Sequence, residues 1–141
     1  GGGVRVHRQD IRALTAGRYV WQAACFPSGR AFSTITYAGP DGVSPSYAEG
    51  AVFLRKDRLV PARATQVPWI EQWSFNRGDV SLVLETSREK SPIKGTILLA
   101  APVLADAVGG VPARQQAMVR YEWDGEISYG LIDRTFPLNH A

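Results

Sequence analysis

The fold is decided by the stretch Arg120-Tyr-Glu-Trp-Asp-Gly-Glu-Ile-Ser-Tyr-Gly-Leu-Ile-Asp-Arg134. Its Asp-Gly pair separates two runs in which apolar and polar side chains alternate, which is the strongest short-range signal for a β-hairpin. We predict that the two strands span residues 115–122 and 126–135. In the first strand Ala117, Val119 and Tyr121 share one face, because side chains alternate along a strand.

The register of this hairpin is predicted from the face that would be buried. A two-residue loop would set Tyr121 opposite Ser128, whereas a three-residue loop would set Tyr121 near Ile127. The longer loop leaves one face almost entirely apolar, so we predict it, with Gly125 in the left-handed conformation. The same register places Asp133 on the apolar face.

Outward from the hairpin, turn sequences recur at the spacing of an antiparallel meander. They separate runs rich in Val, Ile, Thr and aromatic residues, which favour strands, and helix signals are weak. We therefore predict an all-β fold of about eight or nine strands, either a curled sandwich or a barrel with room for one small ligand. The predicted strands are residues 19–26, 31–38, 47–54, 59–67, 69–75, 80–86, 94–101, 115–122 and 126–135.

Composition indicates one soluble domain. The chain of 141 residues is long enough to bury a core, and we assign residues 4–141 to one domain and residues 1–3 to a tag remnant or a domain boundary. No apolar run is long enough for a membrane span. The net charge of +3 comes from scattered arginines, which argues against nucleic-acid binding.

The reactive residue types are few. The single cysteine, Cys25, excludes an internal disulfide and favours a reducing, cytoplasmic location. The two histidines, His7 and His140, lie near opposite ends of the chain, so we expect no metal site. No phosphate-binding loop or nucleophile motif is present, and we expect no cofactor.

A candidate pocket is indicated by residues 69–75, the segment WIEQWSF. As a strand, this segment would place Glu71 on one face with the rings of Trp69, Trp73 and Phe75. A carboxyl group among apolar rings has a raised pKa and can act as a general acid. Glu71 is therefore the first candidate catalytic residue.

Asp133 is the second candidate, because the predicted register sets it on the apolar face with Tyr129. If Glu71 and Asp133 face one cavity, they form an acid–base pair. The alternatives stay open: Asp133 as a strand-end residue that meets solvent or bonds Gln115, and Glu71 solvated or paired with an arginine such as Arg63.

The last hairpin, residues 120–134, resembles the closing strands of lipocalin-like (calycin) proteins related to carotenoid 1,2-hydratase, also called hydroxyneurosporene synthase. Those proteins end on a strand pair with an Asp-Gly turn, followed by a glycine and an acidic residue. The segment His7-Arg-Gln-Asp-Ile-Arg12, followed by Tyr19-Val-Trp21, is similar to the family's mid-chain motif of His, Arg-Asp and Trp. The Trp-Gly usual in that motif is absent here, and Asp133 stands where Glu is commoner. The resemblance covers only the C-terminal half of the family's chains.

The resemblance implies a calycin-type barrel, an apolar ligand and water addition to an alkene. It also implies that His7, Asp10 and Arg12 position a polar end of the ligand, with a solvated N-terminal segment as the alternative. Because only one of two halves is matched, an apolar flank would be uncovered, and we expect a homo-oligomer or a missing partner domain.

Three classes of function fit these observations. We predict a binding module for an apolar small molecule (terpenoid, polyketide or fatty-acid-like) in an aromatic-lined pocket, because no complete catalytic set is visible. The alternative is a hydratase, isomerase or cyclase that uses carboxyl general acid–base catalysis, and the third class is an interaction domain with a filled core. The predicted ligand contacts are Trp69, Trp73, Phe75, Tyr121, Tyr129, His7 and Arg12.

Overall fold

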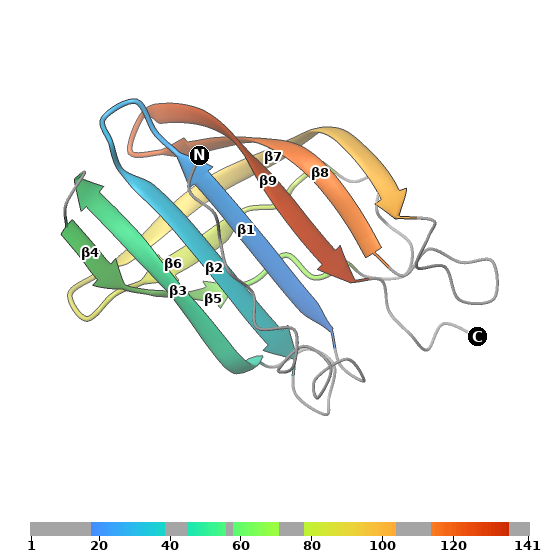
Figure 1. Cartoon of the computed structure of the whole chain (residues 1–141), viewed down its shortest axis with the longest axis horizontal. Helices are drawn as coiled ribbons and strands as arrows, with labels where there is room; N and C mark the ends of the chain where they lie inside the picture. Colours follow the sequence, from blue (N-terminus) through green and yellow to red (C-terminus); the bar gives the residue numbers. More distant parts are fainter. Residues whose placement is uncertain (1–17, 39–44, 56–57, 71–77, 104–113, 136–141) are drawn as a thin grey trace.

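The computed structural model of the chain is an antiparallel barrel, and it describes residues 18–38, 45–55, 58–70, 78–103 and 114–135 (Figure 1). The described residues contain strands and turns but no helix, which confirms the predicted all-β class. The strands are β1 (Tyr19–Cys25), β2 (Ala31–Ala38), β3 (Pro45–Arg55), β4 (Arg58–Pro61), β5 (Arg63–Gln66), β6 (Leu82–Glu85), β7 (Lys90–Val103), β8 (Arg114–Trp123) and β9 (Glu126–Thr135).

The sheet follows the chain as a meander and curls until its first and last strands meet. Its order is β4-β3-β2-β1-β9-β8-β7-β6-β5, and β1 pairs antiparallel with β9. The predicted strand at residues 59–67 is interrupted at Ala62, where the chain changes partners: β4 pairs with β3, and β5 pairs with β6. This change joins the two ends of the order, so the barrel nearly closes with β4 and β5 acting as one strand. A barrel of about eight strands encloses space for side chains or for one small ligand.

The two ends of the barrel differ in their connections. At one end, the turn end, short turns join β1 to β2, β3 to β4, β6 to β7 and β8 to β9 (Figure 1). At the opposite end, the loop end, β2, β7 and β9 end and β1, β3 and β8 begin.

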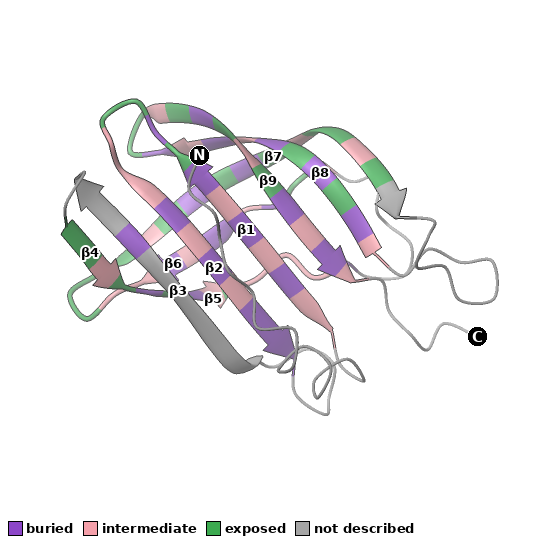
Figure 2. Ribbon diagram, viewed as in Figure 1, coloured by how far each residue is buried: buried purple, intermediate pink, exposed green. Residues whose placement is uncertain are grey.

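Side chains alternate between the interior and the outer face, as the pleat of a strand requires (Figure 2). On β8 the residues Gln115, Ala117, Val119, Tyr121 and Trp123 are buried, and Gln116 and Met118 between them are exposed. On β9 the buried residues are Ser128, Ile132 and Arg134. Apart from Ser128, the interior is therefore apolar toward the turn end, and it contains more polar side chains toward the loop end.

The loop of the last hairpin is shorter than predicted. Tyr121 pairs with Ser128 and Trp123 pairs with Glu126, so only Asp124 and Gly125 form the loop. Both have positive φ, 49° and 82°, as a type I′ turn requires. The left-handed Gly125 is confirmed, but the three-residue loop is wrong, because a type I′ turn matches the twist of the strands.

This register moves residues from the predicted apolar face to the outside of the barrel. Tyr129 is 64% exposed and Leu131 is 51% exposed. Arg134 lies on the interior face in place of Asp133, and it is only 3% exposed. The prediction failed because it assumed that the buried face is wholly apolar.

An aromatic cluster fills the turn end of the barrel. It consists of Phe26, Phe32, Tyr121 and Trp123, all buried. The rings of Phe32 and Tyr121 meet edge-on at 5.2 Å between centroids, and those of Phe26 and Trp123 meet edge-on at 5.6 Å. These are favourable aromatic geometries, so the cluster closes this end with packed side chains.

Arg30 covers the aromatic cluster from outside. Its guanidinium carbon lies 3.9 Å from the centroid of the Trp123 ring, and Nη2 donates to the Trp123 carbonyl. Nη1 is 3.1 Å from Asp124, and Nη2 is 2.9 Å from Glu126. Hydrogen bonds from Ser28, and smaller effects of Arg30, hold the pKa of Glu126 below its usual range. Arg30 thus links the β1–β2 turn to the β8–β9 turn.

We expect Arg30→Lys to destabilise the barrel by about 1 kcal/mol, because lysine keeps the charge but not the planar stacking and forked donors. Urea unfolding measures this change. Arg88→Lys is the control, because Arg88 is exposed in the β6–β7 turn and its replacement should change stability by less than about 0.5 kcal/mol. Equal stability of the two variants would contradict a role for the stacked guanidinium.

Two glycines make room for the ring of Tyr121. A Cβ on Gly95 would lie 2.9 Å from Tyr121 Cε1, and a Cβ on Gly130 would lie 3.0 Å from Cε2. A Cβ on Gly130 would also collide with the carbonyl oxygen of Ala23. Glycine is therefore required on both strands that flank Tyr121, and most strictly at Gly130.

Candidate ligand-binding site at the loop end

One row of inward side chains crosses four neighbouring strands near the loop end. Val20 of β1 pairs with Thr36 of β2 on one side and with Arg134 of β9 on the other. Arg134 in turn pairs with Gln115 of β8. All four residues are between 1% and 3% exposed. We call these four residues the arginine row.

The adjacent row, one step nearer the turn end, is also partly polar. It consists of Thr34, Gln22, Ile132 and Ala117 on the same four strands. Gln22 Nε2 donates to the carbonyl of Val80 across the interior at a long 3.4 Å. Buried polar groups need partners to offset their lost hydration, so two such rows are unusual for an interior that only packs.

Arg134 is the most strongly polar group in the interior. Its Nε donates to Oε1 of Gln115 at 3.0 Å, and Nη1 donates to the carbonyl of Pro68 at 2.7 Å. Burial, with a smaller effect of the positive charge of Arg18, lowers the pKa of Arg134 to about 10. Among the described residues no carboxylate forms an ion pair with Arg134. Within the described residues, the Arg134 guanidinium is therefore bound by two neutral oxygens, those of the Gln115 amide and the Pro68 carbonyl.

Thr36 carries a buried hydroxyl without a partner. It is 1% exposed, and its Oγ1 makes no hydrogen bond. An unsatisfied buried polar group lowers folding stability by about 1–3 kcal/mol. A hydroxyl at this position therefore needs an explanation other than packing.

The segment after β5 reaches the same end of the barrel. Arg18 donates to the carbonyl of Ile70, and its guanidinium carbon lies 5.3 Å from the centroid of the Trp69 ring. Ile70 is buried, whereas Trp69 is half-buried and packs against the core. Trp69 was predicted to begin a strand, but residues 67–70 lie outside the strands.

Apolar side chains on β7 face the interior but keep part of their surface accessible. Ile97 pairs with the buried Val119, and Ala100 pairs with the buried Ala117, so both point inward. Both are nevertheless only half-buried, as are Val67 and Trp69. Ile97 and Ala100 therefore present apolar surface that is only partly covered.

The predicted contacts Tyr121 and Tyr129 lie apart. Tyr121 is fully buried in the aromatic cluster, where burial raises the pKa of its hydroxyl and the hydroxyl makes one long hydrogen bond, 3.5 Å, to the Leu131 carbonyl. Tyr129 lies on the outer face. Trp69 packs against the core, so the structure does not bring Tyr129 and Trp69 together.

Asp133 lies on the outer wall instead of the interior. Its carboxylate accepts hydrogen bonds from Tyr19 at 3.2 Å, from Arg114 at 3.3 Å and from Gln116 at 3.3 Å. Burial and the charge of Asp133 raise the pKa of Tyr19 to about 12. Asp133 thus resembles the alternative given above, a residue at the end of a strand that bonds a glutamine of β8. The glutamine is Gln116 and not Gln115.

The other predicted site residues, Glu71, Trp73, Phe75, His7 and Arg12, lie outside the described residues. Arg63, considered above as a partner of Glu71, forms an ion pair with Glu85. Sequence reasoning missed Arg134, Gln115 and Thr36. The alternation along residues 126–134 could have indicated Arg134. A two-residue loop turns the even-numbered side chains of β9 inward, and Arg134 is one of them.

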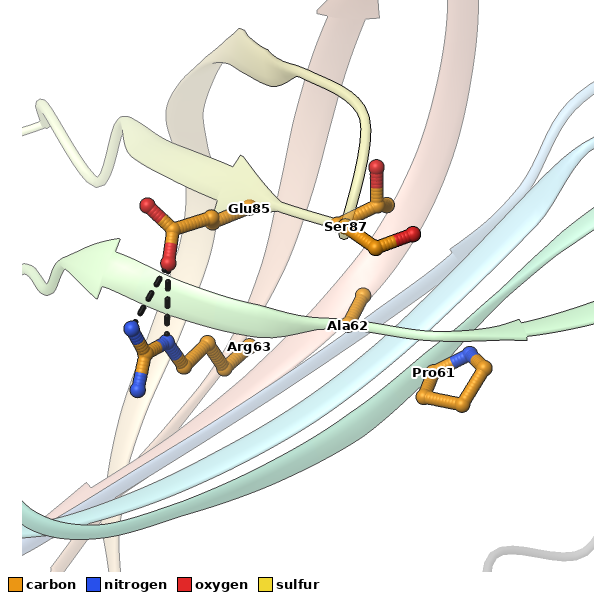
Figure 3. Close-up of a pocket in the computed structure, with 6 residues that line it drawn as sticks. Pro61, Ala62, Arg63, Glu85 and Ser87 are labelled. Atoms are coloured by element: carbon orange, nitrogen blue, oxygen red, sulfur yellow. Dashed lines mark hydrogen bonds and ion pairs between the residues drawn. The ribbon is translucent and has the colours of Figure 1, made fainter.

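A shallow groove of about 380 Å³ lies elsewhere, beside the change of partners at Ala62 (Figure 3). Within it, Nε and Nη2 of Arg63 donate to one oxygen of Glu85 at 3.0 and 2.7 Å. The hydrogen bond from Arg63 holds the pKa of Glu85 below its usual range. The charged groups of the groove therefore pair with each other. The groove is lined by Pro61, Ala62, Arg63, Glu85, Thr86 and Ser87.

Within the described ranges, no group of three or more His, Cys, Asp or Glu side chains is placed to hold a metal ion. The same ranges contain no helix that is long and apolar enough to cross a membrane. Comparison of the chain with models of protein families, with curated proteins and with solved structures finds no match. The assignment of a function therefore depends on the geometry of the site.

Proposed function

We propose that this chain binds an apolar small molecule inside its barrel, with entry from the loop end. The observation that carries the proposal is the partly accessible apolar surface of Ile97 and Ala100 on β7, and of Val67 and Trp69, all of which pack against the same core. Apolar surface that is open to solvent is unfavourable. A ligand that covers it stabilises the complex by about 25 cal/mol for each Å² buried.

The position of the aromatic cluster favours the loop-end half of the barrel as the place of the ligand. Phe32, Tyr121 and Trp123 already contact one another, so the turn end is filled. Toward the loop end the inward residues of β2 and β8 include Thr36, Ala38 and Ala117, which are small. Small wall residues leave room for a guest, and Trp69 supplies a broad ring against which it can lie.

The position of Asp133 argues against the catalytic role predicted for this residue. A hydratase, isomerase or cyclase of the kind considered above needs a carboxyl group inside the barrel. The carboxylate of Asp133 lies on the outer wall and is bonded to Arg114 and Gln116. The lipocalin-like relationship agrees with this proposal and stays a prediction.

The expected homo-oligomer or partner domain also stays a prediction. On the outer face, Leu99 pairs with Met118, and Met118 pairs with Leu131, so three exposed apolar side chains form a ladder across β7, β8 and β9. A second copy or a partner domain would cover this ladder.

Two neighbouring residues of β7 provide a test of the binding site. Ala100 faces the interior, and Leu99 faces outward with 66% exposure. Ala100→Trp should fill the accessible space and weaken binding of the neutral dye Nile red by tenfold or more, because the bulky ring covers this apolar surface. Leu99→Trp is the control and should leave the dissociation constant unchanged.

The dye's fluorescence gives the affinity, and circular dichroism confirms that both variants fold. Failure of the wild-type protein to bind any neutral apolar dye at micromolar concentration would overturn the proposal. Equal loss of affinity in the two variants would place the dye on the outer face and would also overturn it.

A further inference from the structure

We propose that the bound molecule carries a carboxylate, and that Arg134 binds this carboxylate with the hydroxyl of Thr36 as a second donor. This inference rests on the proposed function and names the class of ligand, an apolar body with a carboxylic acid at one end. The acid would lie at the arginine row, and the apolar body would contact Ile97, Ala100 and Trp69.

The first argument is the cost of burying a cation. A buried guanidinium loses several kcal/mol of hydration, and an anion that accepts its hydrogen bonds offsets this loss best. The described partners of Arg134 are the amide oxygen of Gln115 and the carbonyl of Pro68, both neutral. These bonds use two of the five N–H donors of the side chain, which leaves donors for a ligand.

The second argument is the position of Thr36. Its buried hydroxyl has no partner, and it lies in the same row as Arg134, with Val20 between them. Two strand spacings separate Thr36 from Arg134, so their backbones are roughly 10 Å apart. We expect a carboxylate bound beside Val20 to accept from the guanidinium through one oxygen and from the Thr36 hydroxyl through the other.

The third argument is electrostatic. Arg18 lies close enough to lower the pKa of Arg134 by its positive charge, so two cations stand at the loop end. An anion that accepts hydrogen bonds from Arg134 adds a favourable charge interaction, which the neutral oxygens of Gln115 and Pro68 do not supply.

The surroundings favour a carboxylate over a phosphate. Val20 within the arginine row, and Ile132 and Ala117 in the adjacent row, surround Arg134 with apolar surface. One guanidinium and one hydroxyl match the two oxygens and single charge of a carboxylate. A phosphate group would bring a further charge and a third oxygen, which cost more to desolvate against this apolar surface.

The test compares dodecanoic acid with dodecan-1-ol, which share an apolar chain and differ in the charged end. Calorimetry at neutral pH should show that the wild-type protein binds the acid at least tenfold more tightly. Arg134→Gln should abolish this preference by weakening acid binding about ten- to hundredfold, while the affinity for the alcohol changes little. Arg88→Gln, at an exposed turn position, is the control and should keep the preference.

Thr36→Val keeps the test decisive if Arg134→Gln fails to fold. Valine has the shape of threonine without the hydroxyl, and no hydrogen bond is lost because Oγ1 makes none. Thr36→Val should therefore raise the melting temperature of the ligand-free protein but weaken acid binding several-fold.

Each remaining outcome contradicts one proposal. Equal binding of acid and alcohol by wild type and variants would overturn the carboxylate inference and leave the proposed function in place. Binding of neither compound would count against the proposed function itself. Tighter binding of dodecyl phosphate than of the acid, or unchanged acid affinity in Thr36→Val, would overturn the inference.

Discussion

Gly130→Ala is expected to cost about 3 kcal/mol or more of folding stability, because the added methyl group collides with a neighbouring strand. The contacts are the carbonyl oxygen of Ala23, which belongs to the β1 backbone, and the ring of Tyr121 behind it. A backbone atom cannot rotate away as a flexible side chain can, so β1 and β9 must separate. The melting temperature should fall by about 10 °C.

Gly78→Ala provides the matched control for this substitution. A Cβ on Gly78 would meet Cγ2 of Thr96 at 3.7 Å, an ordinary van der Waals contact, and Gly78 does not have positive φ. Its stability should therefore stay within about 0.5 kcal/mol of wild type. If thermal unfolding shows the same loss for both alanine variants, close approach at the β1–β9 pairing is not the cause.

Tyr121→Ala is expected to destabilise the barrel by about 4 kcal/mol, because it removes a fully buried ring from the centre of the aromatic cluster. The vacated space lies between Gly95 and Gly130, and neither glycine has a side chain that could move into it. Urea unfolding should show a lower midpoint with a cooperative transition.

Tyr121→Phe separates the ring from its hydroxyl. The hydroxyl makes only one long hydrogen bond, so this variant should lie within about 1 kcal/mol of wild type. A large loss in Tyr121→Phe would show that the hydroxyl, and not the packed ring, is what the fold requires at this position.

The sequence predicted the class of fold well, because strand signals are local. The alternation along residues 31–38 gave a strand with the observed bounds, Ala31–Ala38, and the Asp-Gly pair gave the turn of the last hairpin. The break at Ala62 was not predictable from alternation, because the residues on both sides continue the same pattern. It arises from closure of the sheet, where one strand must pair with both β3 and β6.

The candidate site was harder to predict, because its interior is partly polar. A rule that places only apolar side chains in the interior predicts that an arginine and a threonine face solvent, although both are buried here. That assumption chose the wrong loop length and exchanged the faces of Asp133 and Arg134. Once the hairpin register is known, the arginine row follows from the pairing of β1, β2, β8 and β9.

The pairing of β1 with β9 has a consequence for the speed of folding. The other strand pairs of the meander form between segments that follow each other in the chain, so their contacts are local. The hydrogen bond from Tyr19 to Asp133 instead joins residues 114 positions apart. Closing so long a loop reduces the entropy of the chain before the stabilising contacts between its ends can form. Contacts between residues so far apart in the sequence therefore slow folding. The meander can assemble hairpin by hairpin, while the barrel, and with it the row of side chains that spans β1 and β9, forms only in the final long-range step.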